Sequence, residues 1–469
     1  MKRLATIAML LAIVGSNVFA DAKPGGIARQ VSMGGSVAGS GLILNPFIMD
    51  DPALVLLNPA YQSMYSDYAW MNVAGGALTG LSTGNNGYGH QTAGLAFSLN
   101  NEWTIGAILS HDPSAANNVS SLISGGTVVP GFPALPSIVQ RTGGGQPIPA
   151  IANVWELLTT YDMGSVDLGF GFMYGNSHND TKSSVPSPST SVDNEASASM
   201  FGFRAGAIID LGSGNSVDLS GALRLDNATD KMTNTPAVTG AGGEYSASGT
   251  EIQVAARAKM KMSNKVNFVP YGMFAVLSAE PKEDSPPTGG TATTVTEDVS
   301  AMAYAVGVGG EYRTPTFYLA GGVSLQSAKA ELKVNSGGTT PTTTTTTFTH
   351  FALPVLNIGG EWWFTDWLAG RGGYYRSLAK NKTETEISSA GVTSTSETST
   401  SFPHSFLLVG GLNPSTFDGL VTLGLGFRFG GFSLDATVSE EALRRGLGLI
   451  GAQDNINTFG YITTSYNFE

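Results

Sequence analysis

The stretch TEIQVAARAKMKM, residues 250 to 262, alternates between apolar and polar side chains. Successive side chains of a β-strand point to opposite faces, so its even-numbered residues from Ile252 to Met262 would share one apolar face. The opposite face would carry Gln253, Arg257, Lys259 and Lys261. An arginine or lysine that faces lipid at mid-bilayer costs about 2–4 kcal/mol. If the apolar face meets lipid, these cations must point into an enclosed interior.

The same alternation recurs in SVDLSGALRLD (216 to 226) and LVTLGLGFRFG (420 to 430). Two kinds of connection separate such segments. The short kind is rich in turn residues: NNE (100 to 102), MGS (163 to 165), SNK (263 to 265), TP (314 to 315), TD (365 to 366) and GG (430 to 431). The long kind is polar and is expected to form loops: 111 to 150, 176 to 195, 280 to 297, 331 to 349 and 381 to 401. Strands with tight turns at one end and long loops at the other are typical of an outer-membrane β-barrel.

The number of strands follows from counting alternating segments between Tyr68 and Phe468. The sequence predicts an all-β fold, a transmembrane antiparallel β-barrel of 14, possibly 16, strands over residues 67 to 469. The stretch 402 to 428 leaves that choice open. Either number gives a lumen wider than wall side chains can fill, because about 8 strands already reach that limit. The interior must therefore hold water, a plug or a ligand.

Aromatic residues gather near the expected tight turns, as in EWWFTDW at 361 to 367. Tyrosine and tryptophan at strand ends are typical of the girdles at the two faces of a membrane. The chain ends in FGYITTSYNFE, in which Ile462, Thr464, Tyr466 and Phe468 share one face. This ending resembles the C-terminal recognition strand of bacterial outer-membrane proteins, although Glu469 follows the last aromatic residue.

Composition agrees with a membrane environment. Charged residues make up 13% of the chain, against about 25% in typical soluble domains. The net charge of −12 makes nucleic acid an improbable partner, since phosphates call for a basic surface. Residues 1 to 20 have the charged start, apolar centre and small final residues of a secretory signal peptide. We therefore expect export to the bacterial outer membrane, with its lipid as a partner.

Residues 21 to 66 do not read as strands of the wall. They carry Pro46, Pro52 and Pro59, and proline is confined to edges or bulges of a sheet. A closed barrel has no edges, yet DDPALVLLNPAYQSMY (50 to 65) is too apolar for a free tail. A hatch folded inside the lumen satisfies both constraints.

Within this stretch, Ala28-Arg29, Met33-Gly34-Gly35, Val37-Ala38, Asp50-Asp51 and Asn58-Pro59-Ala60 occur in a familiar order. The order resembles the N-terminal signature of the FadL-like family (OmpP1/FadL/TodX-like), outer-membrane transporters of long-chain fatty acids and aromatic hydrocarbons. The rest of the chain agrees with that family in architecture alone. An insert with a proline, GSGLILNPFIM, departs from the pattern and leaves ligand contacts unassigned.

The resemblance implies a 14-stranded barrel whose hatch blocks the lumen and moves to admit a hydrophobic small-molecule ligand. By position, the hatch residues would be Met33, Gly34, Gly35, Asn58, Pro59 and Ala60. A related group with the same signature serves as a structural partner in protein secretion, so a protein partner stays open.

Charged residues on the inward-facing side of the expected strands form a further set. It comprises Arg204, Arg224, Arg257, Lys259, Glu311, Glu361, Arg371, Arg428 and Asp435. One interpretation is a set of ion pairs, with Asp167, Asp218 and Asp226 among the partners, that braces the wall against the hatch. The alternative is a selective polar channel.

The sequence gives little support for catalysis, metal binding or dinucleotide binding. The motif GLGLIG (446 to 451) lacks the strand and helix that a dinucleotide site needs. The histidines show no metal-ligand spacing, and no nucleophile with an adjacent base is evident. We expect no enzyme activity, no catalytic residues, no metal site and no cofactor.

Three functions remain open at this point. The first is hatch-gated transport of hydrophobic small molecules such as long-chain fatty acids or hydrocarbons. The second is a water-filled porin for small polar solutes. The third is a barrel that transports nothing and acts as a secretion-system partner.

Overall fold

The computed structural model describes most of the chain. The described residues are 25–38, 41–75, 88–111, 151, 153–186, 189–235, 243–288, 291–336, 341–402, 420–438 and 459–468. The signal peptide expected at 1 to 20, the motif at 446 to 451 and the stretch 403 to 419 lie outside them. Within the described residues, no helix is long and apolar enough to cross a membrane.

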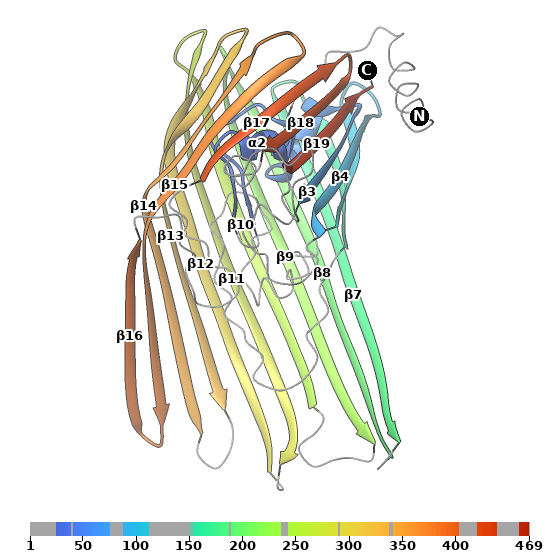
Figure 1. Cartoon of the computed structure of the whole chain (residues 1–469), viewed down its shortest axis with the longest axis vertical. Helices are drawn as coiled ribbons and strands as arrows, with labels where there is room; N and C mark the ends of the chain where they lie inside the picture. Colours follow the sequence, from blue (N-terminus) through green and yellow to red (C-terminus); the bar gives the residue numbers. More distant parts are fainter. Residues whose placement is uncertain are drawn as a thin grey trace, which may run out of the picture.

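The strands form one closed antiparallel barrel, shown in Figure 1. They are β3 (Tyr68–Gly75), β4 (Tyr88–Ser98), β5 (Trp103–His111), β6 (Asn153–Asp162), β7 (Val166–Pro186), β8 (Ser189–Gly212), β9 (Asn215–Thr235), β10 (Gly243–Lys261), β11 (Val266–Thr288), β12 (Thr291–Arg313), β13 (Phe317–Ser336), β14 (Thr342–Trp363), β15 (Leu368–Ser389), β16 (Val392–Phe402), β17 (Leu420–Phe429), β18 (Phe432–Val438) and β19 (Phe459–Asn467). The last strand, β19, pairs with β3 from Asn467 opposite Tyr68 to Tyr461 opposite Ala74, which closes the wall.

The barrel has 16 strand positions. From β3 to β15, each strand pairs with the next one along the chain. Strand β15 then has two further partners, β17 over 368 to 375 and β16 over 379 to 389. Strands β16 and β17 thus occupy one position at different heights, as Figure 1 shows. The expected 14 strands were too few, and the larger number that the sequence left open is confirmed.

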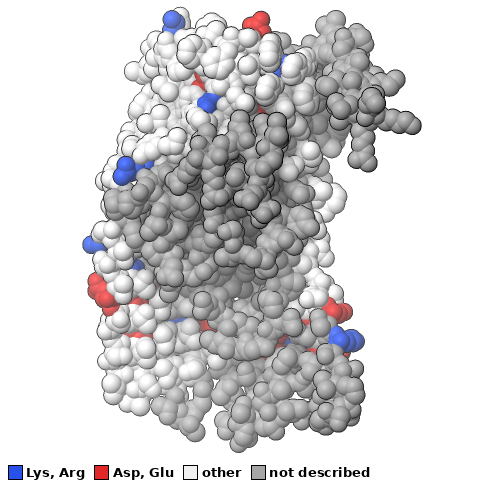
Figure 2. Space-filling model, viewed as in Figure 1, with Lys and Arg blue, Asp and Glu red and all other residues white. Residues whose placement is uncertain are grey.

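Side chains of β10 alternate in exposure along the strand, as the sequence pattern predicts. On β10 the side chains of Gln253 and Arg257 are buried toward the interior, while Ile252, Val254 and Met260 are exposed on the outer surface. On β19, Ile462, Thr464 and Tyr466 lie on the less buried face. Figure 2 shows few charged side chains among the described residues on one side of the molecule.

The exposed apolar residues form a belt around the wall near the tight turns. On β12 the belt runs from Met302 to Tyr312, about 33 Å along the strand and about 25 Å along the barrel axis at a typical tilt. That height matches the apolar band of a membrane barrel. At the turns, aromatic rings pair as a girdle: Trp103 with Tyr161, Tyr312 with Phe317, Trp362 with Phe364, and Trp367 with Phe427 and Phe429.

The long polar connections are strands for much of their length. The expected loops 176 to 195, 280 to 297, 331 to 349 and 381 to 401 fall largely inside β7–β8, β11–β12, β13–β14 and β15–β16. In Figure 1 these hairpins extend the wall downward, away from the tight turns. Threonine favours strands because its β-branched side chain fits a pleated surface, which accounts for the threonine run of β14. The polar composition predicted contact with solvent, but it did not distinguish strands from loops in these segments.

The N-terminal segment lies inside the wall near the tight turns, and we call residues 25 to 66 the plug. It contains α2 (Ile27–Ser32), β1 (Ser36–Ala38), β2 (Gly41–Ile43), and the short 3₁₀ helices η2 (Pro52–Leu56) and η3 (Pro59–Tyr65). Figure 1 shows α2 close to β17, β18 and β19. Both 3₁₀ helices begin with proline at the first position, where the missing N–H costs nothing. Asp51 and Asn58 cap them through the backbone N–H groups of Ala53 and Ala60.

The belt can be tested with a charge placed at its centre. Val308 is 49% exposed on the outer face of β12, and Val308→Arg should lower the free energy of unfolding by about 2–4 kcal/mol in lipid vesicles. Ser300→Arg lies on the same face of the same strand beyond the belt and is the matched control. Denaturant unfolding of both variants in vesicles measures the difference, and equal effects would place the membrane elsewhere on the wall.

Candidate functional site

The plug spans the lumen between two opposite parts of the wall. Helix α2 contacts β15, β17, β18 and β19, whereas η3 contacts β5, β6, β7 and β8. After η3 the chain leaves the lumen at Ser66 and Asp67 and enters β3 at Tyr68. The exit therefore lies beyond Asn58-Pro59-Ala60, which is held deep inside.

Inward-facing glycines let the plug backbone approach the wall closely. A Cβ atom on Gly359 would lie 2.1 Å from the carbonyl oxygen of Met33, and one on Gly373 would lie 2.1 Å from the nitrogen of Gly34. A Cβ on Gly206 would overlap the side chain of Asn58 in the same way. Because glycine has no Cβ, these positions form a cradle that larger residues would fill.

Wall hydroxyl groups satisfy the backbone of the short helix α2. The hydroxyl of Thr463 accepts from the N–H of Ala28 at 3.0 Å, and Thr437 donates to the carbonyl of Ala28 at 3.0 Å. Thr422 donates to the carbonyl of Ser32 at 3.2 Å. The free N–H and C=O groups at helix ends need such partners when they are buried.

Arg29 is the centre of the first polar network. This residue of α2 is 3% exposed. Its Nε donates to Glu361 of β14 at 3.0 Å, and its Nη1 donates to Asp51 at 2.9 Å and to the carbonyl of Asp50 at 2.8 Å. The guanidinium also lies 5.2 Å from the ring centre of Tyr318. A buried charge is tolerated when partners surround it in this way.

The network continues into the wall beyond Glu361. Arg371 of β15 donates from Nε to the same Glu361 carboxylate at 2.6 Å and pairs with Asp435 of β18. Asp435 in turn accepts from the N–H of Gly25 at 3.1 Å. The plug and three strands of the wall thus share one chain of alternating charges.

Two adjacent aspartates of the plug experience different electrostatic environments. Burial raises the pKa of Asp51 to about 6, although Arg29 and the N–H groups of Ala53 and Gly26 favour its charged form. Burial also disfavours the charge on Asp50, but the guanidiniums of Arg313 and Arg29 hold the pKa of that carboxyl below its ordinary value. Asp50 and Arg313 are about half exposed, so their pair is a rim contact.

A second anchor holds the end of the plug that contains Asn58. The Asn58 side chain donates to Asp218 and to the carbonyl of Leu219, and the Tyr61 hydroxyl donates to Asp218 at 3.0 Å. Arg257 donates to Asp218 at 2.8 Å and to the Tyr61 hydroxyl at 3.0 Å. One wall carboxylate therefore binds two plug side chains and one wall cation.

Two further wall residues reach the plug backbone. Arg204 pairs with Glu156 and donates to the carbonyl of Val55 at 3.2 Å. Glu311 accepts from the N–H of Met49 at 2.8 Å. These contacts occupy plug groups that have no partner within the plug itself.

A small void lies between the plug and one part of the wall. A void among η2, η3, β3, β4, β5 and β6 has a volume of about 10 Å³, which is about one water molecule. Phe47 of the plug packs edge-on against Tyr271 of β11 with ring centres 5.5 Å apart. The plug therefore closes this part of the lumen by direct packing.

The predicted hatch residues lie in the plug. Met33, Gly34, Gly35, Asn58, Pro59 and Ala60 are all buried. The inward-facing charges divide into two groups. Arg204, Arg257, Glu311, Glu361 and Asp435 bind the plug directly, and Arg371 acts through Glu361 and Asp435.

Arg224 and Arg428, two of the remaining predicted charges, contact residues of the wall. Arg224 pairs with Asp226 and Glu251 within the wall. Arg428 stacks on the ring of Trp363 at 3.6 Å. Lys259 is half-buried at an inward position and forms no salt bridge with a described residue.

Sequence reasoning did not assign a role to Arg29, Asp51, Glu156, Tyr61 or Tyr318. Arg29 and Asp51 belong to the N-terminal signature, and their opposite charges were the sequence signal for an ion pair between them. Glu156, Tyr61 and Tyr318 gave no such signal, since only the closed barrel brings them against the network.

Beyond the second anchor, small apolar side chains line the described inner wall. This cluster contains Ala198, Met200, Ala228, Ala247, Leu277, Ala279, Val299, Ala301, Ala303, Ala328 and Ala330. Ile151, which precedes β6 in the chain, is fully buried and belongs to the same cluster.

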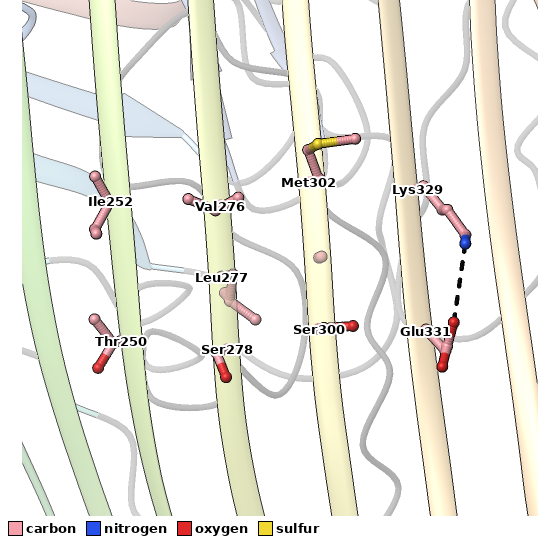
Figure 3. Close-up of a pocket in the computed structure, with 10 residues that line it drawn as sticks. Thr250, Ile252, Val276, Leu277, Ser278, Ser300, Met302, Lys329 and Glu331 are labelled. Carbon is pink, nitrogen blue, oxygen red and sulfur yellow. Dashed lines mark ion pairs between the residues drawn. The ribbon is translucent and has the colours of Figure 1, made fainter.

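A groove of about 380 Å³ lies elsewhere, on the outer surface of β10 to β13. Figure 3 shows Ile252, Val276 and Met302 across neighbouring strands, beside the Lys329–Glu331 ion pair. Ile252 and Met302 are exposed outward, so this groove opens to the surroundings of the barrel. It has no part in a path through the lumen.

One group of possible metal-binding side chains occurs among the described residues. His178, Asp180 and Glu195 have ligand atoms within 4.8 Å of one another on the surface of the β7–β8 hairpin. All are exposed, and the pair of His178 with Asp180 at 3.2 Å accounts for their closeness. His350 instead is buried and bonds Asn381 at 2.7 Å.

Comparison with known proteins adds the following. No protein-family model and no curated protein matches the chain in sequence. Among solved structures, the Pseudomonas putida toluene transporter TodX is similar at 11% identity, covering 96% of this chain and 97% of that one, with a TM-score of 0.35. The Ralstonia pickettii toluene transporter TbuX gives 11% identity, coverage of 95% and 99%, and a TM-score of 0.35. The alcaligin receptor FauA from Bordetella pertussis has 9% identity, with coverage of 85% of this chain and 75% of that one, and a TM-score of 0.31.

Removing Arg29 should loosen the plug. Arg29→Ala leaves part of the charge on Glu361 and Asp51 unmatched, and breaking a buried pair costs about 3–5 kcal/mol, toward the low end here because Arg371 stays. The rim variant Arg313→Ala is the control, since an exposed pair contributes about 0–1 kcal/mol. Single-channel recordings should show openings for the first variant only. Equal behaviour of the two would mean that Arg29 does not hold the plug.

The glycine cradle offers a second test with a neighbouring control. Gly359→Ala places a methyl group against the Met33 carbonyl, whereas a Cβ on the adjacent, outward-facing Gly360 would be 3.7 Å from its nearest neighbour. We expect Gly359→Ala to expose plug residues to added protease while the barrel stays folded. Gly360→Ala should leave the digestion pattern unchanged. Protection of the plug in both variants would contradict the close approach.

Proposed function

We propose that the protein carries hydrophobic small molecules across the bacterial outer membrane through a barrel gated by its plug. The observation that carries the proposal is the manner in which the plug is held. Side chains such as those of Arg29, Asn58 and Glu361 form contacts between the plug and the wall. The sheet hydrogen bonds of the wall run between its own strands. The plug can therefore shift without opening the sheet.

The nature of the cargo is proposed from the lumen beyond the plug. Its described wall has an apolar cluster of alanine, methionine, valine and leucine, which favours apolar solutes, and buried polar residues such as Asp230 and His350 lie beside that cluster. Long-chain fatty acids and hydrocarbons belong to this class, as does the toluene for which TodX and TbuX are named.

The outer membrane is proposed as the location on independent grounds. The apolar belt and its aromatic girdle on a closed barrel suit that membrane. The signal peptide expected at 1 to 20 supports export.

The alternative functions gain no specific observation from the described residues. A porin needs an open aqueous path, whereas the void that η2 and η3 leave against β3 to β6 is close to one water in volume. A secretion-system partner would need a binding surface for another protein, and no described feature points to one.

Deleting residues 21 to 66 of the precursor tests the gate. Intact cells that lack their own fatty acid uptake should accumulate radiolabelled oleate or toluene when they carry the wild-type protein. The deletion should also admit a hydrophilic antibiotic that wild-type cells exclude, because nothing would then fill the lumen. If uptake of every hydrophobic probe equals that of cells without the protein, the proposed transport is wrong. If the deletion stays tight to the antibiotic, the gate is wrong.

A further inference from the structure

The groove on the outer surface of β10 to β13 lies where the apolar belt ends. Its first row of outward-facing side chains is apolar, since Ile252 is opposite Val276 and Val276 is opposite Met302. Met302 is the last residue of the belt on β12. The second row is one step farther from the tight turns and consists of Thr250, Ser278 and Ser300. Figure 3 shows both rows across the strands. The groove therefore spans the border between lipid chains and lipid headgroups.

The groove has room for part of a lipid. Ser278 and Ser300 are short, so it extends down to Leu277 and Ala301, which are buried in the wall. Its volume of about 380 Å³ lies within the range of about 300–1,000 Å³ that small-molecule sites have. Because it opens outward and not to the lumen, its occupant must come from the membrane around the barrel.

Two lysines lie at the edge of the belt beside this groove. Lys329 of β13 lines the groove and is opposite Met302, and Lys380 of β15 is opposite Phe351. Met302 and Phe351 are exposed apolar residues of the outer surface. A lysine stem covers apolar surface while its ammonium group reaches the polar headgroups. Both ammonium groups are therefore at the level of the lipid headgroups.

Neither lysine is held by a strong ion pair within the described structure. Nζ of Lys329 is 3.9 Å from Glu331, which is beyond hydrogen-bond distance, and the lysine side chain is 58% exposed. An exposed pair of this kind contributes little. Lys380 is exposed and forms no salt bridge with a described residue. An ammonium group binds phosphate as a point charge, so a lipid phosphate is a suitable partner.

The side chains farther from the tight turns suit a headgroup that carries hydroxyl groups. Glu331 is opposite Ser300, and Glu280 and Asp298 are exposed one step beyond that row. Carboxylates accept hydrogen bonds from hydroxyl groups, and serine and threonine both donate and accept them. A headgroup with only negative charge would meet like charges here, whereas a sugar would find acceptors.

We propose that this groove binds a lipid with a phosphorylated sugar headgroup. An acyl chain lies on Ile252, Val276 and Met302, the phosphate binds Lys329, and sugar hydroxyls bind Ser300 and Glu331. The groove is at the edge of the belt away from the tight turns, which are periplasmic in such barrels. It therefore faces the outer leaflet, where lipids of this class are found in bacterial outer membranes. The site rests on the proposed location of the protein and is independent of transport.

Native mass spectrometry of the full-length mature protein in detergent tests the headgroup. The probes are lipid A with two phosphates, the same lipid without phosphate, and phosphatidylglycerol. EDTA is present throughout, so that divalent cations do not bridge phosphates to carboxylates. We expect one phosphorylated lipid A per protein, bound about fivefold more tightly than the form without phosphate, which is the gain from one lysine near a membrane surface. Phosphatidylglycerol should bind more weakly than phosphorylated lipid A.

Two variants locate the site, and each has a matched control. Lys329→Gln should abolish the preference for phosphate, whereas Lys182→Gln removes the same charge from the distant β7–β8 hairpin and should change nothing. Ser278→Phe fills the groove and should weaken both forms of lipid A. Its control is Ser199→Phe, which places the same ring one step beyond exposed Phe201 on the outer face of β8. All four positions are on the outer surface, so the barrel is expected to fold.

Several results would overturn the proposal. Lipid A without phosphate bound as tightly as the phosphorylated form would remove the role of Lys329. Phosphatidylglycerol bound as tightly as phosphorylated lipid A would remove the sugar, and equal effects of Ser278→Phe and Ser199→Phe would remove the groove. The expected binding together with no uptake of hydrophobic probes by cells would leave this site standing and overturn the transport function alone.

Discussion

The closure of the wall sets the problem that the rest of the chain solves. No water is available in a bilayer to satisfy a free strand edge, so β19 must return to β3 and every strand must be paired on both sides. A closed wall with 16 strand positions has an interior too wide for its own side chains. The plug supplies the missing bulk, but it cannot join a sheet whose hydrogen bonds are already used. It must be held by side chains and by close approach at glycine.

That requirement explains why charges are so concentrated inside a chain that has few of them. Arg29 binds Glu361 and Asp51, and Asp218 binds Asn58 and Tyr61. Each such contact is directional and holds the plug in one position. Apolar packing alone would allow several positions of similar energy. The same contacts involve no wall backbone donor, so their loss leaves the barrel intact.

The sequence was sufficient for much of the fold because membrane burial acts on every second residue of a strand. Alternation in 250 to 262 predicted which side chains face the lumen, and proline in 50 to 65 predicted a segment inside the wall. The height of the wall could not be predicted in this way. Threonine and serine in β14 and β16 are polar on both faces, so the sequence pattern there predicted a loop. The wall partner of Arg29 could not be predicted either. Glu361 lies 332 positions away in the sequence, and only the closure of the barrel brings it to Arg29.

The described inner wall carries polar groups at several levels. Asp218 and Arg257 lie at the plug, and Arg224 and Glu251 lie farther along the same strands, with alanine-rich surface beyond them. A uniformly apolar tube would hold an apolar solute with no preferred position, and a uniformly polar one would exclude it. The described wall is neither, because buried polar residues such as Asp230 and His350 interrupt its apolar cluster.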